Sequence, residues 1–117
     1  MKNVTIYHNP RCSKSRETLA LLEQHGVTPE VVLYLETPPS VDQLKKLLKE
    51  LGFTSARELM RKKENLYKEL KLADESLSEA QLLAAMVANP KLIERPIVVN
   101  GNKARIGRPP EQVLEIL

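Results

Sequence analysis

The single cysteine of the chain, Cys12, lies in a segment rich in basic and hydroxyl side chains, just before a predicted helix. Unpaired N–H groups and the positive dipole end at a helix N-terminus favour a thiolate over a thiol, and the thiolate is the nucleophile. Arg11, Lys14 and Arg16 add positive charge within one helical turn. A lone cysteine in a cytosolic protein is most often a buried packing residue. This setting nevertheless predicts that Cys12 is a nucleophile.

The loop Asn9–Arg16 is also a candidate anion site. Backbone N–H groups at a helix start bind phosphate-like ions, and Arg supplies planar donors that match a tetrahedral oxyanion. Ser15 adds a hydroxyl donor, whereas Arg16 taken alone is as readily a surface helix residue. His8 could serve as an acid, a base or a hydrogen-bond donor, although such a histidine more often only orients a loop.

Three other arginines have an informative context. Arg61 ends an apolar-spaced segment, Arg95 precedes Pro96 at the start of a predicted strand, and Arg108 precedes two prolines at the start of the last predicted helix. Each arginine taken alone is more typical of a surface residue. Their convergence on one oxyanion is the sharper hypothesis, and sequence spacing does not test it.

The elements that must position these residues begin with an alternating strand over 4–7, broken by the segment 8–11. A helix is predicted from Cys12 or Ser13 to Gly26, with Leu19 and Leu22 on one face. The continuously apolar run 31–35 predicts a second strand buried on both faces. A strand–helix–strand unit of this length predicts parallel strands.

Residues 40–89 have an all-helical pattern, with predicted helix starts at Ser40, Ser55 and Ser78, each followed three residues later by Gln or Glu. The strand 97–99 and the return strand 103–106 flank Asn100-Gly101, a strong hairpin signal. Pro110 then suits the first turn of a last helix bearing Val113, Leu114 and Leu117.

The predicted fold class is therefore α/β, a thioredoxin-like βαβ…ββα mixed sheet with an all-helical insert at about 40–89, within one domain of residues 1–117. In such a fold the loop before the third strand approaches the loop of the nucleophile. Arg95 could then reach Cys12, and the Arg95–Pro96 bond becomes a candidate for the cis form.

Composition limits the alternatives. The net charge of +3 arises largely from Lys and Glu alternating along predicted helices, which indicates solvated helix faces and no nucleic-acid partner. No apolar run approaches the ~20 residues that span a membrane, and Met1–Thr5 does not resemble the start of a signal peptide. With one cysteine, we expect a cytoplasmic protein without an internal disulfide. One Cys and two distant His make no metal-ligand set.

Several blocks together resemble the glutathione/glutaredoxin-linked arsenate reductase family. The loop Tyr7–Arg16 resembles that family's active-site loop. The resemblance extends over nearly the whole chain, through Tyr34-Leu35-Glu36-Thr37-Pro38-Pro39, Arg61-Lys62, Asn89-Pro90, Arg95-Pro96-Ile97-Val98-Val99 and Arg108-Pro109.

The resemblance implies that Cys12 attacks arsenate, that glutathione acts as co-substrate with no bound cofactor, and that glutaredoxin resolves the resulting mixed disulfide. By the same resemblance Arg61, Arg95 and Arg108 bind the oxyanion, and His8, Ser15 and Arg16 support the thiolate.

The residues that flank Cys12 differ from those at the same positions in the resistance enzymes of this family. They look more like those of its short chromosomal members. Cys12-Ser13-Lys14-Ser15 also resembles a Cys-x-x-Ser redox motif. Two alternatives therefore stay open. One is a glutathione-linked thiol oxidoreductase acting on another substrate. The other is a non-enzymatic, redox-linked regulator that binds RNA polymerase, although such sensors usually use a Cys-x-x-Cys pair.

Overall fold

The computed structural model describes residues 4–117, so the first three residues of the Met1–Thr5 interpretation lie outside it. The chain separates into two compact units. The sheet unit contains the residues up to Thr37 and Arg95–Leu117, and the helical unit is Pro38–Glu94. The helical unit is slightly wider than the predicted insert. None of the helices in residues 4–117 is long and apolar enough to span a membrane.

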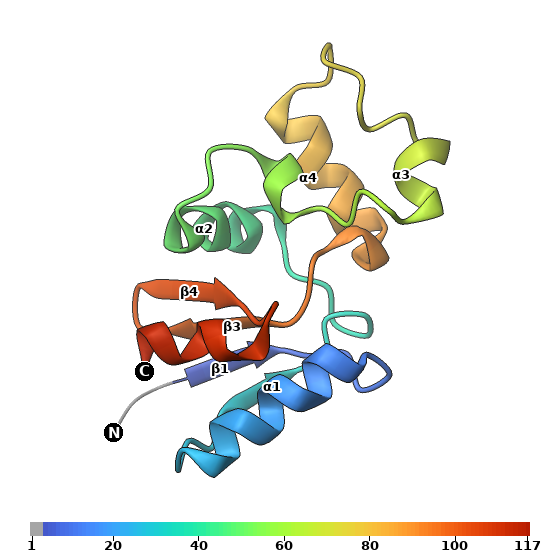
Figure 1. Cartoon of the computed structure of the whole chain (residues 1–117). Helices are drawn as coiled ribbons and strands as arrows, with labels where there is room; N and C mark the ends of the chain where they lie inside the picture. The colour runs from blue at the N-terminus through green and yellow to red at the C-terminus, as the bar shows by residue number, and fades with distance from the viewer. Residues whose placement is uncertain (1–3) are drawn as a thin grey trace. The chain divides into compact units, whose positions relative to one another are not determined.

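The sheet unit is built on four strands in the order β2-β1-β3-β4 (Figure 1). Its elements are β1 (Val4–Tyr7), α1 (Ser13–Gln24), β2 (Glu30–Val32), β3 (Ile97–Asn100), β4 (Lys103–Ile106) and the 3₁₀ helix η3 (Pro110–Ile116). β1 pairs in parallel with β2 and antiparallel with β3, and β3 pairs antiparallel with β4. This mixed sheet confirms the predicted fold class.

The limits of α1 follow from local chemistry. Cys12 is the N-cap residue, with extended backbone angles of φ −92° and ψ 124°. Beyond the helix, Gly26 adopts φ 76°, a left-handed conformation that glycine adopts without a steric penalty. Inside it, Ser15, Thr18 and Leu22 are buried at spacings of three and four, which places one stripe of α1 against the sheet.

The predicted hairpin is present. Asn100 pairs with Lys103, so Gly101 and Asn102 form a two-residue loop, and Gly101 has φ 64°. Gly101 is the loop residue with positive φ, and glycine at the first position of the loop is the pattern of a type II′ hairpin turn.

The predicted second strand is present and pairs in parallel with β1, but the prediction that it extends over 31–35 and is buried on both faces is wrong. β2 ends at Val32, and the following residues form a turn in which the N–H groups of Glu36 and Thr37 donate to the Leu33 carbonyl, both at 2.9 Å. Val31 is 44% exposed, Leu33 37% and Leu35 38%. Among the strands of residues 4–117, β2 is an edge strand that pairs with β1, so an apolar run there is not covered as it would be in a central strand.

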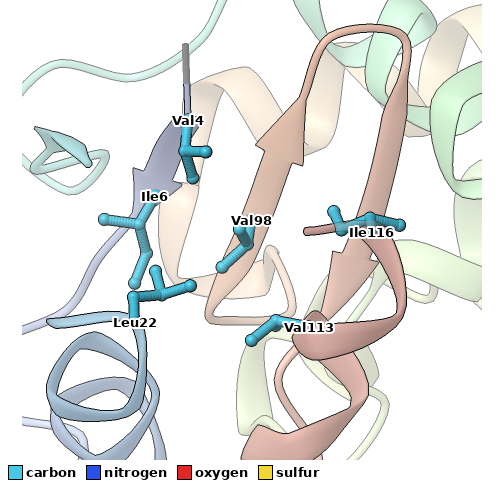
Figure 2. Close-up of a cluster of buried hydrophobic side chains, with 6 residues drawn as sticks. All are labelled: Val4, Ile6, Leu22, Val98, Val113 and Ile116. Atoms are coloured by element: carbon cyan, nitrogen blue, oxygen red, sulfur yellow. The ribbon is translucent and has the colours of Figure 1, made fainter. Parts of the chain in front are cut away.

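One apolar cluster joins the sheet to α1 and η3 (Figure 2). Its buried members are Val4 and Ile6 from β1, Val98 from β3, Leu22 from α1, and Val113 and Ile116 from η3. Ile6 and Val98 are paired across the two strands, so α1 and η3 cover the same face of the sheet.

The last helix is a 3₁₀ helix, which corrects the expected pattern. Pro110, Val113 and Ile116 are its buried residues, and their spacing of three matches the 3₁₀ period. Leu114 and Leu117, two further apolar residues of the predicted helix, are half-buried.

The helical unit contains α2 (Val41–Leu51), η1 (Ala56–Leu59), α3 (Asn65–Glu69), α4 (Glu79–Ala88) and η2 (Pro90–Leu92). Full capping boxes open α2 at Ser40 and α4 at Ser78, as predicted. At Ser55 the box does not form, because the Glu58 carboxylate accepts from Thr54 instead, and only the short 3₁₀ helix η1 follows. Sequence pattern predicted neither α3 nor η2.

Candidate active site

Cys12 lies half-buried at the N-terminus of α1. Its N–H donates to the Asn9 carbonyl at 3.0 Å, and its own carbonyl accepts the first helical bond from Arg16 at 3.0 Å. The backbone N–H groups of Ser15 and Lys14 lower the pKa of the Cys12 thiol. The thiol therefore lies where the unpaired donors of the helix converge, as the sequence indicated.

Four groups counteract the effect of burial on the pKa of the Cys12 thiol. Burial raises the pKa of the Cys12 thiol, but the Ser15 N–H, the Arg95 guanidinium, the Lys14 N–H and the Arg108 guanidinium together hold that pKa below its usual value. Each of the four stabilises the negative charge of the thiolate. The result is a larger thiolate fraction at neutral pH than in a free cysteine.

Arg108 and Arg95 reach Cys12 from the far end of the chain. Nη2 of Arg108 lies 3.6 Å from the Cys12 sulfur, and Nε of Arg108 donates to the Arg95 carbonyl at 2.8 Å. Arg95 is half-buried and Arg108 is exposed. The peptide bonds Arg95–Pro96 and Arg108–Pro109 are both cis, the first as predicted and the second not anticipated.

Strand register explains this convergence. Tyr7, at the end of β1, pairs with Ile97 at the start of β3, and Ile97 pairs with Ile106 at the end of β4. Three segments therefore lie at the same end of these strands. They are the loop that leads to Cys12, the segment with Arg95 that precedes β3, and the segment with Arg108 that follows β4.

A buried pair fixes the loop before Cys12. Nδ1 of His8 lies 2.6 Å from Oγ of Ser15, and the N–H of Asn9 donates to the same oxygen at 3.0 Å. Burial lowers the pKa of His8, and the charge of Arg16 lowers it further. His8 is thus held in its neutral form, which suits an orienting role better than that of a cation. Ser15 ties the end of β1 to the first turn of α1.

The other basic side chains of the loop have different roles. Nη1 of Arg16 donates to the Pro10 carbonyl at 2.9 Å, so this exposed side chain stabilises the loop before Cys12. The ammonium group of Lys14 lies 3.5 Å from the Glu17 carboxylate. The N–H of Arg11 donates to the Asn9 side chain at 3.0 Å.

Arg61 belongs to the helical unit. Its guanidinium forms an ion pair with Glu64 at 3.1 Å, and its N–H donates to the Leu92 carbonyl at 2.7 Å. Of the three predicted arginines, Arg95 and Arg108 therefore gather at Cys12 within the sheet unit, while the role of Arg61 stays a prediction.

Residues 7–116 match the ArsC family. The chain belongs to that family. An arsenate reductase of Haemophilus influenzae is 56% identical over 115 residues, which cover 98% of this chain and 99% of that protein. The solved structure of an arsenate reductase from Vibrio cholerae is 64% identical, with a TM-score of 0.98 over 99% of this chain and 98% of the other. YfgD of Escherichia coli K12, described as uncharacterised, is 73% identical over 116 residues, 99% of this chain and 98% of that protein.

Sequence reasoning missed one residue that shapes this ArsC-family site. Gly107 is buried, and its N–H donates to the Pro96 carbonyl at 2.9 Å. A Cβ at this position would clash with the side chain of Thr18 and lie 2.9 Å from Cγ of Pro96. The position directly before Arg108 was the available signal, because a glycine beside a functional residue often permits close backbone approach.

The chemistry open to this ArsC-family site follows from its donors. A stabilised thiolate with two adjacent guanidinium groups can attack an electrophilic centre that carries negatively charged oxygens. Within residues 4–117, no cluster of three or more His, Cys, Asp or Glu side chains could hold a metal ion.

Proposed function

We propose that this protein reduces arsenate to arsenite through a covalent adduct on Cys12. The observation that carries the proposal is the Cys12 sulfur, with its lowered pKa, lying 3.6 Å from the Arg108 guanidinium. The names of its relatives, which are arsenate reductases at 50–56% identity over nearly the full chain, support the same reaction.

The first step is nucleophilic substitution at arsenic. The Cys12 thiolate forms a sulfur–arsenic bond, and one arsenate oxygen leaves as water after taking up protons. Arg95 and Arg108 offset the negative charge on the remaining oxygens, and donors that meet charge as it develops contribute most to such a step.

The second step moves two electrons. Glutathione supplies a second thiol, the two sulfurs become a disulfide, and arsenic(V) leaves as arsenite. Glutaredoxin then reduces the mixed disulfide on Cys12, so one protein cysteine is enough. A cycle of this kind requires a reducing compartment, which favours the cytoplasm.

The test is a coupled assay containing arsenate, glutathione, glutaredoxin, glutathione reductase and NADPH. Wild-type protein should oxidise NADPH in an arsenate-dependent manner, and folded Cys12→Ser protein should not. Arsenate-dependent turnover by Cys12→Ser would refute the nucleophile. If wild-type protein ignores arsenate but reduces a glutathione mixed disulfide, the substrate is wrong and a general thiol oxidoreductase replaces it.

Arg61 enters the same assay as a separate question. If Arg61 binds the oxyanion, as the resemblance implies, Arg61→Ala should raise the KM for arsenate. Lys62→Ala removes an exposed cation at the next position and serves as the control. Equal KM values for the two variants would remove Arg61 from the site.

A further inference from the structure

A hollow of about 340 Å³ lies in the sheet unit between α1 and the start of η3. Lys14, Glu17, Leu21 and Gln24 line its α1 wall, and Glu111 is the charged residue of the opposite wall. The volume is within the range of small-molecule sites. The reaction proposed above uses none of these side chains.

One end of the hollow adjoins the reactive sulfur. Lys14, at that end, lies two residues after Cys12, and its backbone N–H lowers the pKa of the Cys12 thiol. Pro109, which also lines the hollow, directly follows Arg108. The α1 residues of the wall recur every three or four positions and so form one stripe of the helix. From Lys14 to Gln24 this stripe extends about 15 Å, at ~1.5 Å per residue, away from Cys12.

The charges of the lining select a class of ligand. The hollow presents the Lys14 ammonium and the Glu17 carboxylate, which lie 3.5 Å apart as an ion pair, together with the Glu111 carboxylate and the neutral amide of Gln24. Two carboxylates repel a doubly charged oxyanion, so the hollow is unsuited to arsenate itself. One cation beside two anions instead complements a group that carries both an ammonium and a carboxylate, as an α-amino acid does. Leu21 and the prolines add apolar contact for a short connecting chain.

We infer that this hollow binds the amino-acid end of the peptide thiol that reduces the Cys12 adduct, and so directs its sulfur toward Cys12. The inference rests on the proposed function, because it assumes a thiol as electron donor. Glu111 and Glu17 face the ligand's ammonium, Lys14 faces its carboxylate, and the donor's chain follows the α1 stripe toward the arsenic. No new bond is formed in the hollow.

S-methylglutathione is the probe, because its blocked sulfur cannot react with Cys12. Titrated into ¹⁵N-labelled full-length protein, it should shift the NMR signals of Glu17, Leu21, Gln24 and Glu111. Glu111→Gln should weaken its Kd by up to about fivefold, the value of one exposed charge pair. Glu23→Gln removes an exposed carboxylate of α1 that lies outside the hollow, and should leave the Kd unchanged. The probe acetylated on its amino group should bind more weakly than the parent compound.

Three results would overturn the inference: no shifts along the α1 stripe, equal effects of Glu111→Gln and Glu23→Gln, or equal affinity for the acetylated probe. A kinetic readout accompanies them, since Glu111→Gln should raise the KM for glutathione and leave the KM for arsenate unaltered. Mass spectrometry of the Cys12–arsenate adduct without glutathione tests the reaction separately. An adduct without probe binding rejects the hollow alone, and probe binding without an adduct rejects the reaction alone.

Discussion

The guanidinium of Arg108 contacts the Cys12 sulfur through Nη2 at 3.6 Å while its Nε donates to the Arg95 carbonyl at 2.8 Å. Although the side chain is exposed, this second bond fixes the plane of the guanidinium relative to the sulfur. A lysine at the same position has a single terminal nitrogen on a flexible stem and lacks the rigid planar fork that makes these two contacts in a fixed geometry. The backbone of one arginine thus orients the charge of the other toward the nucleophile.

The thiolate prediction follows from that relationship. Only the thiolate is alkylated, so the rate of Cys12 alkylation by iodoacetamide should rise with pH through a midpoint below the ~8.5 of a free cysteine. Arg108→Gln removes a charge that lowers the Cys12 pKa, so its midpoint should move to higher pH. Arg11→Gln removes an adjacent exposed charge and should have little effect. Coincident profiles for wild type and Arg108→Gln would contradict this assignment.

Removing the Ser15 hydroxyl should destabilise the fold and the loop of the nucleophile. Ser15→Ala leaves the buried His8 ring nitrogen and the Asn9 N–H without their shared partner. We expect the free energy of unfolding in urea to fall by about 1–3 kcal/mol. Ser13→Ala, which changes an exposed serine of the same helix, should stay within about 0.5 kcal/mol of wild type. Equal stability of the two variants would show that the buried contact contributes little.

Gly107→Ala should weaken both stability and activity. The added methyl group would meet the Thr18 side chain and Pro96, so either α1 or the segment leading to Arg108 must shift, at a cost of about 1–3 kcal/mol. Thr18→Ala creates space on one side, so the double variant should recover part of the loss. Unfolding free energies of all four proteins give the coupling between the two sites. Strict additivity would exclude the clash as the cause.

Much of the fold was predictable because its signals are local. Four features each depend on a few neighbouring residues. They are the limits of β1, the helix start at Cys12, the left-handed Gly26 after α1, and the turn at Asn100-Gly101. Backbone stereochemistry and capping act at that range, so the residue types alone indicate them.

Burial was predicted less well, because it depends on what covers an element. The run 31–35 has the apolarity of a central strand, yet β2 lies at the sheet edge and Val31 is exposed. For the same reason the apolar residues predicted for the last helix are Val113, Leu114 and Leu117, whereas the packing of η3 buries Pro110, Val113 and Ile116.

The sequence by itself determined that one cysteine stands at a helix N-terminus, within a loop of donors, in an α/β chain with a helical insert. Only the tertiary structure decided which charges reach that cysteine. The antiparallel register that pairs Tyr7 with Ile97, and Ile97 with Ile106, brings Arg95 and Arg108 to Cys12. These residues are more than eighty positions from Cys12, and contacts at that separation follow from strand pairing, which spacing along the chain does not encode.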